Sequence, residues 1–248
     1  MALKLPVLSI ELPREVRSVH QIEITSRCNL RCRYCTSPDI VAGKYPGRVS
    51  QDMPEDTFRR ALGWAAHYVK AGSQTELNLA GIGESTLHPQ FVQFVHEARA
   101  AVGPTCTLAM ATNGVLATEE IAQAFKEARV QVCVSLHRPE KAHHAVELYR
   151  AAGVLVGISI DPSINANDWA GQVVYKSSPN NQIPCQWLRE GKVFVFADGK
   201  ISTCCLDSSG AGVVGHVNDE IGSVRSKPYG LCRTCYQRLD IRGYNQDG

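Results

Sequence analysis

Three cysteines near the amino terminus are close enough in sequence to bind one metal centre. Cys28, Cys32 and Cys35 fall within eight residues, in the segment Cys-Asn-Leu-Arg-Cys-Arg-Tyr-Cys. A structural zinc site takes four protein ligands, and the isolated His20 is a poor candidate for the fourth. Three thiolates instead suit an iron–sulfur cube that leaves one iron open to a further ligand. A three-cysteine zinc knuckle, or chance clustering, is the alternative.

A second group of cysteines lies near the carboxyl terminus. Cys232 and Cys235 form a Cys-x-x-Cys pair, a common metal half-site that needs two more ligands. Cys204 or Cys205 can supply one of them, and Cys185 the other. Four cysteine ligands make either an iron–sulfur cluster or a zinc ribbon. A cluster held by four cysteines has no open iron, so it is better suited to carrying electrons than to binding substrate.

The composition indicates a globular protein of a reducing compartment. Its 248 residues are 44% hydrophobic and 20% charged, which suffices for a sizeable core. The formal net charge of +2 argues against a strongly basic nucleic-acid binder. The first residues do not read as a signal peptide, and no stretch approaches the ~18 apolar residues of a membrane span. Ten cysteines without a secretory signal favour metal or catalytic roles, so we expect a cytoplasmic protein without a membrane partner.

Short apolar runs alternate with helical patterns from residue 20 to residue 160. Strands are expected at 20–25, 76–80, 105–110, 130–136 and 154–160, and helices at 54–71, 89–102, 118–128 and 144–152. This order predicts an α/β fold, a partial parallel (β/α)5-6 barrel with right-handed crossovers. Ligands of such sheets bind at the carboxyl ends of the strands.

The rest of the chain is expected to divide into three parts. Residues 1–19 form an amino-terminal extension before the barrel at 20–160, and the Asn-, Asp-, Ser- and Pro-containing residues 161–184 form a linker. Residues 193–203 indicate a β-hairpin that turns at Asp198-Gly199. Because residues 185–248 hold half of the cysteines, we expect a separate, small cysteine-rich β-hairpin/helix module there.

Glycine and polar residues follow the expected strands, where a ligand would bind. Glycines let the backbone approach a ligand closely, and a carboxylate can receive an ammonium group. A plain turn or a core role is the alternative for each position. The residues at the four later strand ends are Gly81, Gly83, Glu84, Asn113, Ser135, His137 and Asp161.

In this order, the motifs resemble the radical S-adenosylmethionine (radical SAM) superfamily. The resemblance rests on CxxxCxxC directly after the first strand, with an aromatic residue before the last cysteine. It implies that Cys28, Cys32 and Cys35 bind a [4Fe–4S] cluster whose fourth iron chelates SAM. Tyr34 would then lie near the adenine, and Ser135 would contact the ribose or carboxylate of SAM.

The turn after the second strand also resembles a segment of this superfamily. Gly81-Ile-Gly83-Glu84 is similar to the GGE segment that contacts the SAM amine, although Ser85 stands where a proline is usual. Asn113, after the third strand, fits the family as well. The resemblance therefore assigns this edge of the barrel to SAM.

The carboxyl-terminal cysteines resemble the shortened SPASM, or twitch, domain of radical SAM enzymes. That domain holds one auxiliary [4Fe–4S] cluster, and its pattern selects Cys204, five residues after the hairpin glycine, over Cys205. Cys205 is then either a hydrogen-atom donor or a structural residue. The implied auxiliary ligands are Cys185, Cys204, Cys232 and Cys235.

Other reactive or charged residues carry weaker signals. Cys106 and Cys133 lie in expected strands, where a free cysteine usually packs as a small apolar residue. A loose basic group near the end is either a solvated face or a contact for a phosphate-bearing substrate or a reductase. Its members are Arg225, Lys227, Arg233, Arg238 and Arg242.

The resemblance implies a radical SAM oxidoreductase that cleaves SAM reductively. In the family, SAM receives one electron, splits into methionine and a 5′-deoxyadenosyl radical, and the radical abstracts a hydrogen atom from substrate. The protein supplies orientation and excludes side reactions. An auxiliary cluster suits a net two-electron oxidation, with a flavodoxin or ferredoxin as the expected electron donor.

The expected substrate is a small aminocyclitol- or sugar-like metabolite that is dehydrogenated. The cluster motif begins at residue 28, which leaves no room before it for the recognition domain that peptide-modifying members often carry. One alternative is peptide epimerisation or crosslinking with a separate recognition protein. Another is radical isomerisation of a nucleotide or modified nucleic acid. From a different class, the chain would be a non-enzymatic zinc-binding interaction module or a redox sensor.

Overall fold

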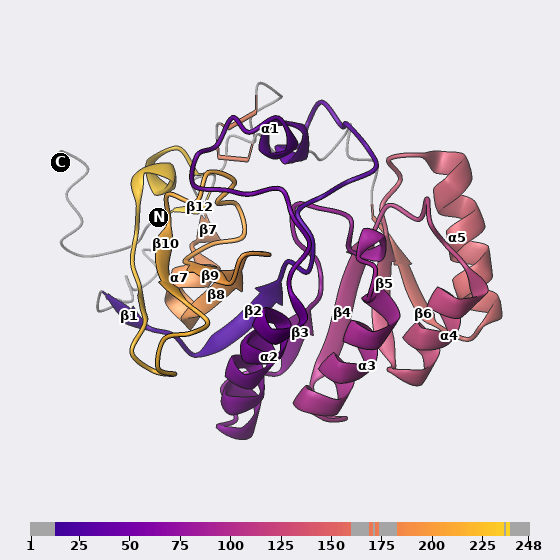
Figure 1. Cartoon of the computed structure of the whole chain (residues 1–248), viewed down its shortest axis with the longest axis horizontal. Helices are drawn as coiled ribbons and strands as arrows, with labels where there is room; N and C mark the ends of the chain where they lie inside the picture. The colour runs from indigo at the N-terminus through magenta and orange to yellow at the C-terminus, as the bar shows by residue number, and fades with distance from the viewer. Residues whose placement is uncertain (1–12, 160–168, 171, 174–182, 236, 239–248) are drawn as a thin grey trace, which may run out of the picture.

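A central sheet of eight strands organises the molecule (Figure 1). This computed structural model describes residues 13–159, 169–170, 172–173, 183–235 and 237–238. Strands β8, β2, β3, β4, β5 and β6 run parallel, and β9 and β10 continue the sheet antiparallel beside β8. The predicted α/β fold with a mainly parallel sheet is confirmed. In spatial order the strands are β10 (Val213–His216), β9 (Lys200–Ser202), β8 (Lys192–Val195), β2 (Ser18–Ile22), β3 (Glu76–Asn78), β4 (Thr107–Thr112), β5 (Val130–Val134) and β6 (Leu155–Ile158).

Helices connect the parallel strands and cover one face of the sheet (Figure 1). Helix α2 buries Phe58, Leu62 and Ala65 at helical spacing, and the ring of Phe58 stacks on Phe94 of α3 at 3.9 Å. The Thr118 side chain caps α4, because its hydroxyl accepts from the backbone N–H of residue 121 at 3.2 Å. The helices are α1 (Ser37–Val41), α2 (Glu55–Lys70), α3 (Phe91–Val102), α4 (Glu119–Glu127) and α5 (Pro139–Ala151), with a 3-10 turn, η1 (Ser85–Leu87).

Some expected boundaries are wrong by a few residues. Helix α5 begins at Pro139 rather than at residue 144, with proline in the first helical turn, where its missing N–H costs nothing. Helix α3 begins at Phe91, two residues beyond the expected proline start. Strand β4 begins at Thr107, so Cys106 lies just before it, buried. These errors are confined to element ends.

The carboxyl-terminal strands belong to the same sheet as the barrel. The expected hairpin is present as β8 and β9, but β8 also pairs in parallel with β2, from Ser18–Lys192 to Ile22–Val195. The sheet thus runs across the boundary expected at residues 161–184. Likewise, residues 14–19, expected in an extension, lie in or between β1 and β2. The remaining elements are β1 (Arg14–Glu15), β7 (Ile183–Pro184), α7 (Gln186–Glu190), β11 (Arg225–Ser226), η2 (Gly230–Arg233) and β12 (Gln237–Arg238), with β1 paired to β11 and β7 to β12.

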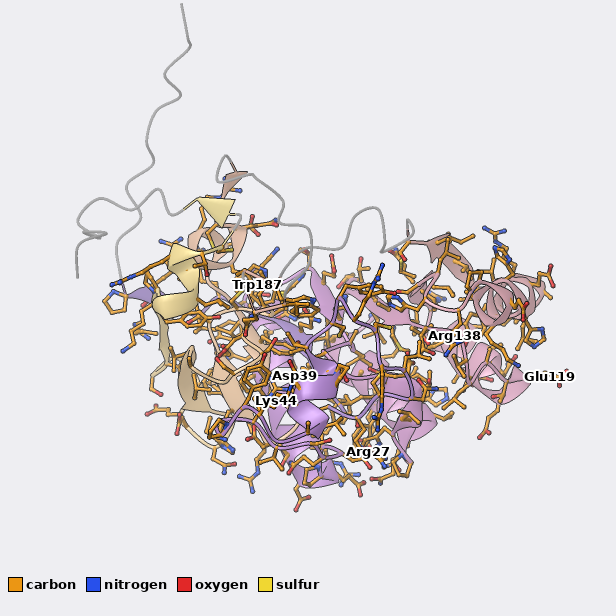
Figure 2. The ribbon with its side chains drawn as sticks, turned by 90° about the horizontal axis from the view of Figure 1, so that it is seen from above. Arg27, Asp39, Lys44, Glu119, Arg138 and Trp187 are labelled. Atoms are coloured by element: carbon orange, nitrogen blue, oxygen red, sulfur yellow. The ribbon has the colours of Figure 1, made fainter. Side chains whose placement is uncertain are left out.

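Seen from above, the two ends of the sheet carry different elements (Figure 2). Glu119 of α4 and Arg138, which precedes α5, stand at one end, and Trp187 of α7 stands toward the other. The segment after the first cysteine loop, marked by the 2.6 Å ion pair of Asp39 and Lys44, lies near Trp187 in this view. In the described part of the chain, no helix is long and apolar enough to cross a membrane.

Candidate active site

An open cavity of about 340 Å³ lies at the carboxyl ends of the barrel strands. It brings together all but one of the residues that the sequence placed at this edge of the barrel. The exception is Asp161, which lies outside the described residues. The predicted residues that line the cavity are Cys28, Cys32, Tyr34, Cys35, Gly81, Gly83, Glu84, Asn113, Ser135 and His137.

The first cysteine loop is folded by its own hydrogen bonds. The backbone N–H of Cys35 donates to the carbonyl of Cys32 at 3.1 Å, and the Sγ of Cys28 accepts from the N–H of Leu30 at 3.4 Å. Burial raises the pKa of the Cys28 thiol, and raises that of Cys35 to about 11. Thiols in such a site release protons when a metal centre binds, because the thiolate is the ligand. Three half-buried thiols around one cavity fit the donor set of a cluster with one open iron.

The two glycines of the Gly81–Glu84 turn let the chain pack against itself. A Cβ at Gly83 would stand 2.2 Å from the carbonyl oxygen of Thr25, and one at Gly81 would stand 2.4 Å from the side chain of Glu23. The sequence suggested that these glycines admit a ligand. Both glycines line the cavity, and a side chain at either position would also meet the residues that lead into the cysteine loop. The glycines therefore also allow the second strand end to pack against that loop.

Glu84 is buried and accepts hydrogen bonds at both carboxylate oxygens. Oε1 accepts from the Thr86 N–H at 3.3 Å and from the hydroxyls of Thr86 and Thr112 at 2.7 and 2.8 Å. Oε2 accepts from the N–H of Asn113 at 2.7 Å. Ser85, in the position where a proline is usual, donates to the carbonyl of Leu79 at 2.7 Å. Glu84 therefore ties the ends of β3 and β4 together, a role that the sequence pattern did not reveal.

An aromatic and polar wall completes the cavity. The Tyr34 hydroxyl hydrogen-bonds Nδ1 of His137 at 2.7 Å, and the two rings stack with centroids 5.5 Å apart. Asn113 donates from Nδ2 to Oδ1 of Asn29 at 2.7 Å. The indole N–H of Trp169 donates to the Tyr34 carbonyl at 3.0 Å. Asn29 and Trp169 were missed, because an asparagine inside a cysteine loop and a tryptophan in a presumed linker carry no spacing signal.

The second cysteine group lines a small apolar cavity of about 30 Å³. Burial raises the pKa of the Cys185 thiol and that of Cys232 to about 12. The hydrogen bond with Cys205, together with burial, raises the pKa of Cys204 well above its usual value. All five carboxyl-terminal cysteines reach this cavity: Cys185, Cys204, Cys205, Cys232 and Cys235.

Among the residues that the structure describes, no three His, Cys, Asp or Glu side chains converge closely enough to hold one metal ion. A [4Fe–4S] cluster binds each thiolate through a different iron, so its cysteines stand farther apart than the ligands of one ion. Both cavities carry several thiols on their walls, and thiolates are the ligands that a cluster of this kind takes.

The two cysteines in expected strands, Cys106 and Cys133, differ in burial. Cys106 is buried as expected, whereas Cys133 is half-buried and lines a separate cavity of about 400 Å³ beside β6. Arg225 of the basic group forms an ion pair with Glu15 at 3.3 Å. The side chains of Arg238 and Arg242 lie outside the described residues.

Comparison with known proteins identifies the family. The Radical SAM superfamily matches residues 22–169, which is more than half of the chain. The chain belongs to the radical SAM superfamily. The predicted family is thereby confirmed, and membership implies a [4Fe–4S] cluster and SAM as cofactors.

Solved radical SAM structures share the fold at low sequence identity. BtrN in complex with AdoMet and 2-DOIA matches with a TM-score of 0.65 and 17% identity, over 84% of this chain and 81% of that chain. Native anSMEcpe with bound AdoMet and Cp18Cys peptide matches with a TM-score of 0.58 and 16% identity, over 82% and 78% of the two chains.

A curated relative matches over a shorter range. The tungsten-containing aldehyde ferredoxin oxidoreductase cofactor-modifying protein of Pyrococcus furiosus is 32% identical over 111 residues. The match covers 45% of this chain and only 28% of the relative.

Proposed function

We propose that this chain is a radical SAM oxidoreductase with two [4Fe–4S] clusters that dehydrogenates a small hydroxylated or amino-bearing metabolite. The observation that carries the proposal is the presence of two thiol-lined cavities joined by short contacts. Gln172 donates to the carbonyls of both Trp169, on the wall of the first cavity, and Leu206, on the wall of the second, each at 2.7 Å. Thr234, within the Cys-x-x-Cys pair, donates to the carbonyl of Ala170.

The first cavity would hold the SAM-binding cluster and SAM itself. Cys28, Cys32 and Cys35 would bind the cluster, which supplies one electron to SAM so that a 5′-deoxyadenosyl radical can take a hydrogen atom from substrate. Tyr34 and Ser135 line the cavity and would contact the adenine and the ribose or carboxylate. The cavity has a volume typical of small-molecule sites, roughly 300–1,000 Å³.

Glu84 requires a more specific proposal than a simple contact with the SAM amine. Its four hydrogen bonds use most of the acceptor capacity of a carboxylate, roughly four lone-pair sites. We assign it the role of holding the Gly81–Glu84 turn and the Asn113 backbone beneath the SAM amine. Its negative charge would still favour an ammonium group nearby.

The second cavity would hold the auxiliary cluster. We assign the ligands Cys185, Cys204, Cys232 and Cys235. Cys205 is adjacent to Cys204 in the sequence and lines the same cavity, so replacing Cys205 is the matched control for replacing Cys204. Removal of two electrons from substrate needs an acceptor for the second one, and a cluster ligated by four cysteines suits that role.

Counting iron tests the cluster assignment. After anaerobic reconstitution with iron and sulfide, we expect about eight irons per chain in wild type and in Cys205→Ser, and about four in Cys204→Ser. With dithionite and SAM, the Cys28/Cys32/Cys35→Ala variant should form no 5′-deoxyadenosine. About four irons in wild type, with zinc retained, would instead make the second site structural and favour redox-neutral chemistry.

The substrate class is supported by the similarity to BtrN, whose structure contains 2-DOIA. A peptide substrate is the second candidate, because the anSMEcpe structure contains the Cp18Cys peptide. A test would incubate the reconstituted protein with SAM, dithionite and either 2-DOIA or Cp18Cys. We expect 5′-deoxyadenosine formation to rise with 2-DOIA or related aminocyclitols, with loss of two hydrogens from the compound. If 5′-deoxyadenosine formation rose only with the peptide, a peptide would replace the small metabolite as the proposed substrate.

A further inference from the structure

A buried ion pair joins the two cysteine sites. Glu23 follows β2, five residues before Cys28, and its side chain is fully buried. Oε1 of Glu23 accepts from Nη2 of Arg48 at 2.5 Å. The Arg48 side chain is only 1% exposed, and its guanidinium lies 3.8 Å from the centre of the Phe196 ring.

Glu23 contacts the ends of two neighbouring strands. Its Oε2 accepts from the N–H of Ile82, in the Gly81–Glu84 turn after β3, at 3.0 Å. Its Oε1 also accepts from the N–H of Ala197, at the hairpin turn after β8, at 3.4 Å. The carboxylate thus holds the proposed SAM-binding turn and the hairpin that leads to Cys204.

Arg48 extends this contact to the second cysteine loop. Its Nη1 donates to the carbonyl of Asp207 at 3.3 Å. The Asp207 carboxylate in turn accepts from the Gly212 N–H at 2.8 Å and from the Ser202 hydroxyl at 2.7 Å, so it organises the loop that contains Cys204 and Cys205. The Arg48 guanidinium therefore bonds both to Glu23, which contacts the Gly81–Glu84 turn, and to Asp207, in the loop that contains Cys204 and Cys205.

Close packing reinforces the same contact. A Cβ at Gly47 would stand 2.5 Å from the carbonyl oxygen of Ser209. The Ser208 hydroxyl donates to that of Thr36 at 2.7 Å, and both side chains are buried. Thr36 directly follows the proposed cluster ligand Cys35. The segment from residue 36 to residue 48 therefore packs directly on residues 207–210.

We propose that the Glu23–Arg48 ion pair fixes the position of the Cys204 loop relative to the proposed SAM-binding turn. It thereby sets the distance over which the electron that the auxiliary cluster takes from substrate would return to the SAM-binding cluster. Arg48 is a positioning residue, since it touches neither cavity. The electron-transfer part rests on the proposed function, whereas the positional part does not. A buried charge pair is suited to this task, because each charge is stable only with its partner in place and so favours one arrangement.

The first test needs no cluster and measures hydrogen–deuterium exchange of the full chain. Lysine keeps the charge of arginine but cannot reach both acceptors with a planar fork. In Arg48→Lys we expect at least tenfold faster exchange in peptides covering 80–84 and 203–212, with β5 unchanged. Arg59→Lys, in the exposed ion pair with Glu97, is the control and should leave both peptides as in wild type. Unchanged protection, or equal acceleration along the whole chain, would overturn the proposal.

A milder variant, Ser208→Ala, tests the loop that contains Cys204 separately from the Gly81–Glu84 turn. Ser208→Ala removes only the hydrogen bond to Thr36, and Ser208 does not contact Glu23. We expect faster exchange at 203–212 with 80–84 unaffected. Acceleration of both peptides in Ser208→Ala would contradict the assignment of the link to Glu23 and Arg48.

The second test concerns the clusters. In reconstituted Arg48→Lys we expect iron to stay at about eight per chain. Electron paramagnetic resonance of the dithionite-reduced protein should show altered magnetic coupling between the clusters. Full iron with wild-type coupling would overturn the electron-transfer part. If wild type itself binds only one cluster, the proposed function fails, and the exchange experiment still decides the positional part.

Discussion

Replacing Glu84 by glutamine tests whether this carboxylate is chiefly a structural group. Oε1 keeps its three donors in Glu84→Gln, but the amide NH₂ that replaces Oε2 faces the N–H of Asn113, now 2.7 Å from another donor. A buried hydrogen bond to a charged group contributes about 1.5–3 kcal/mol, and a buried donor without a partner costs about 1–3 kcal/mol. Allowing for overlap between these terms, we expect the free energy of unfolding to fall by about 3 kcal/mol.

Urea unfolding of the full chain, followed by circular dichroism, measures this loss. Glu147→Gln, an exposed residue of α5, is the matched control and should stay within about 0.5 kcal/mol of wild type. SAM binding should weaken in Glu84→Gln at temperatures where the variant is fully folded, because the turn and Asn113 are no longer held together. An unfolding free energy equal to that of the control would refute the structural reasoning and return Glu84 to the role of a direct ligand of the SAM amine.

Three further changes test the packing around the site. Gly83→Ala places a methyl group 2.2 Å from the Thr25 carbonyl oxygen. We therefore expect the free energy of unfolding in urea to fall by about 3 kcal/mol. An unchanged free energy of unfolding would show that the turn has room to move. Burial lowers the pKa of His88, so its stabilising effect is present above pH ~6.5 and declines as the pH falls toward the lowered pKa. His88→Gln, but not the exposed His143→Gln, should therefore flatten the dependence of melting temperature on pH below ~6.5. Truncation after residue 182 exposes the edge of β2 that pairs with β8, so we expect the fragment to aggregate. A soluble fragment that unfolds cooperatively would indicate that the carboxyl-terminal module is independent of the barrel.

The barrel could be predicted from local sequence patterns. Each parallel strand is a short apolar run, and each connecting helix has a buried stripe at helical spacing, as in α2 with Phe58 and Leu62. The helix expected from residue 118 is observed as α4, which begins one residue later and is capped by Thr118. The start of α5 was missed, because its first turn, Pro139–Lys141, is polar and carries no apolar periodicity.

The pairing of β8 with β2 could not be predicted in the same way. It joins Val19 to Val193 and Ile22 to Val195, residues far apart in sequence. Both strands are short apolar runs, and such runs show that a strand is buried without naming its neighbour. The hairpin was found because its Asp198-Gly199 turn is local, and its place in the barrel sheet was missed because that pairing is not.

Site residues were predictable where a spacing motif marks them and unpredictable where only folding brings them together. The CxxxCxxC loop and the Gly81–Glu84 turn follow strands, and the cavity unites them as expected. Arg48 lies in an irregular segment, and nothing in the sequence signals that it meets Glu23. A buried charge is rarely tolerated without a partner, but the sequence does not show which residue is that partner. The pairing of Glu23 with Arg48 is therefore seen only in the structure.

The position of β2 explains how one small chain can carry two cysteine sites in fixed relation. Three neighbouring parallel strands, β8, β2 and β3, end at the same edge of the sheet, and Ala197, Glu23 and Ile82 follow them. The first cysteine loop continues from β2, the proposed SAM-binding turn from β3, and the hairpin toward Cys204 from β8. Because hydrogen-bonded strands lie about 4.8 Å apart, these three starting points are fixed by the backbone of the sheet before any side chain contributes. Glu23 stands at the middle strand, so a single carboxylate can bond to both neighbours, and Arg48 then needs to bridge only the short remaining distance to Asp207.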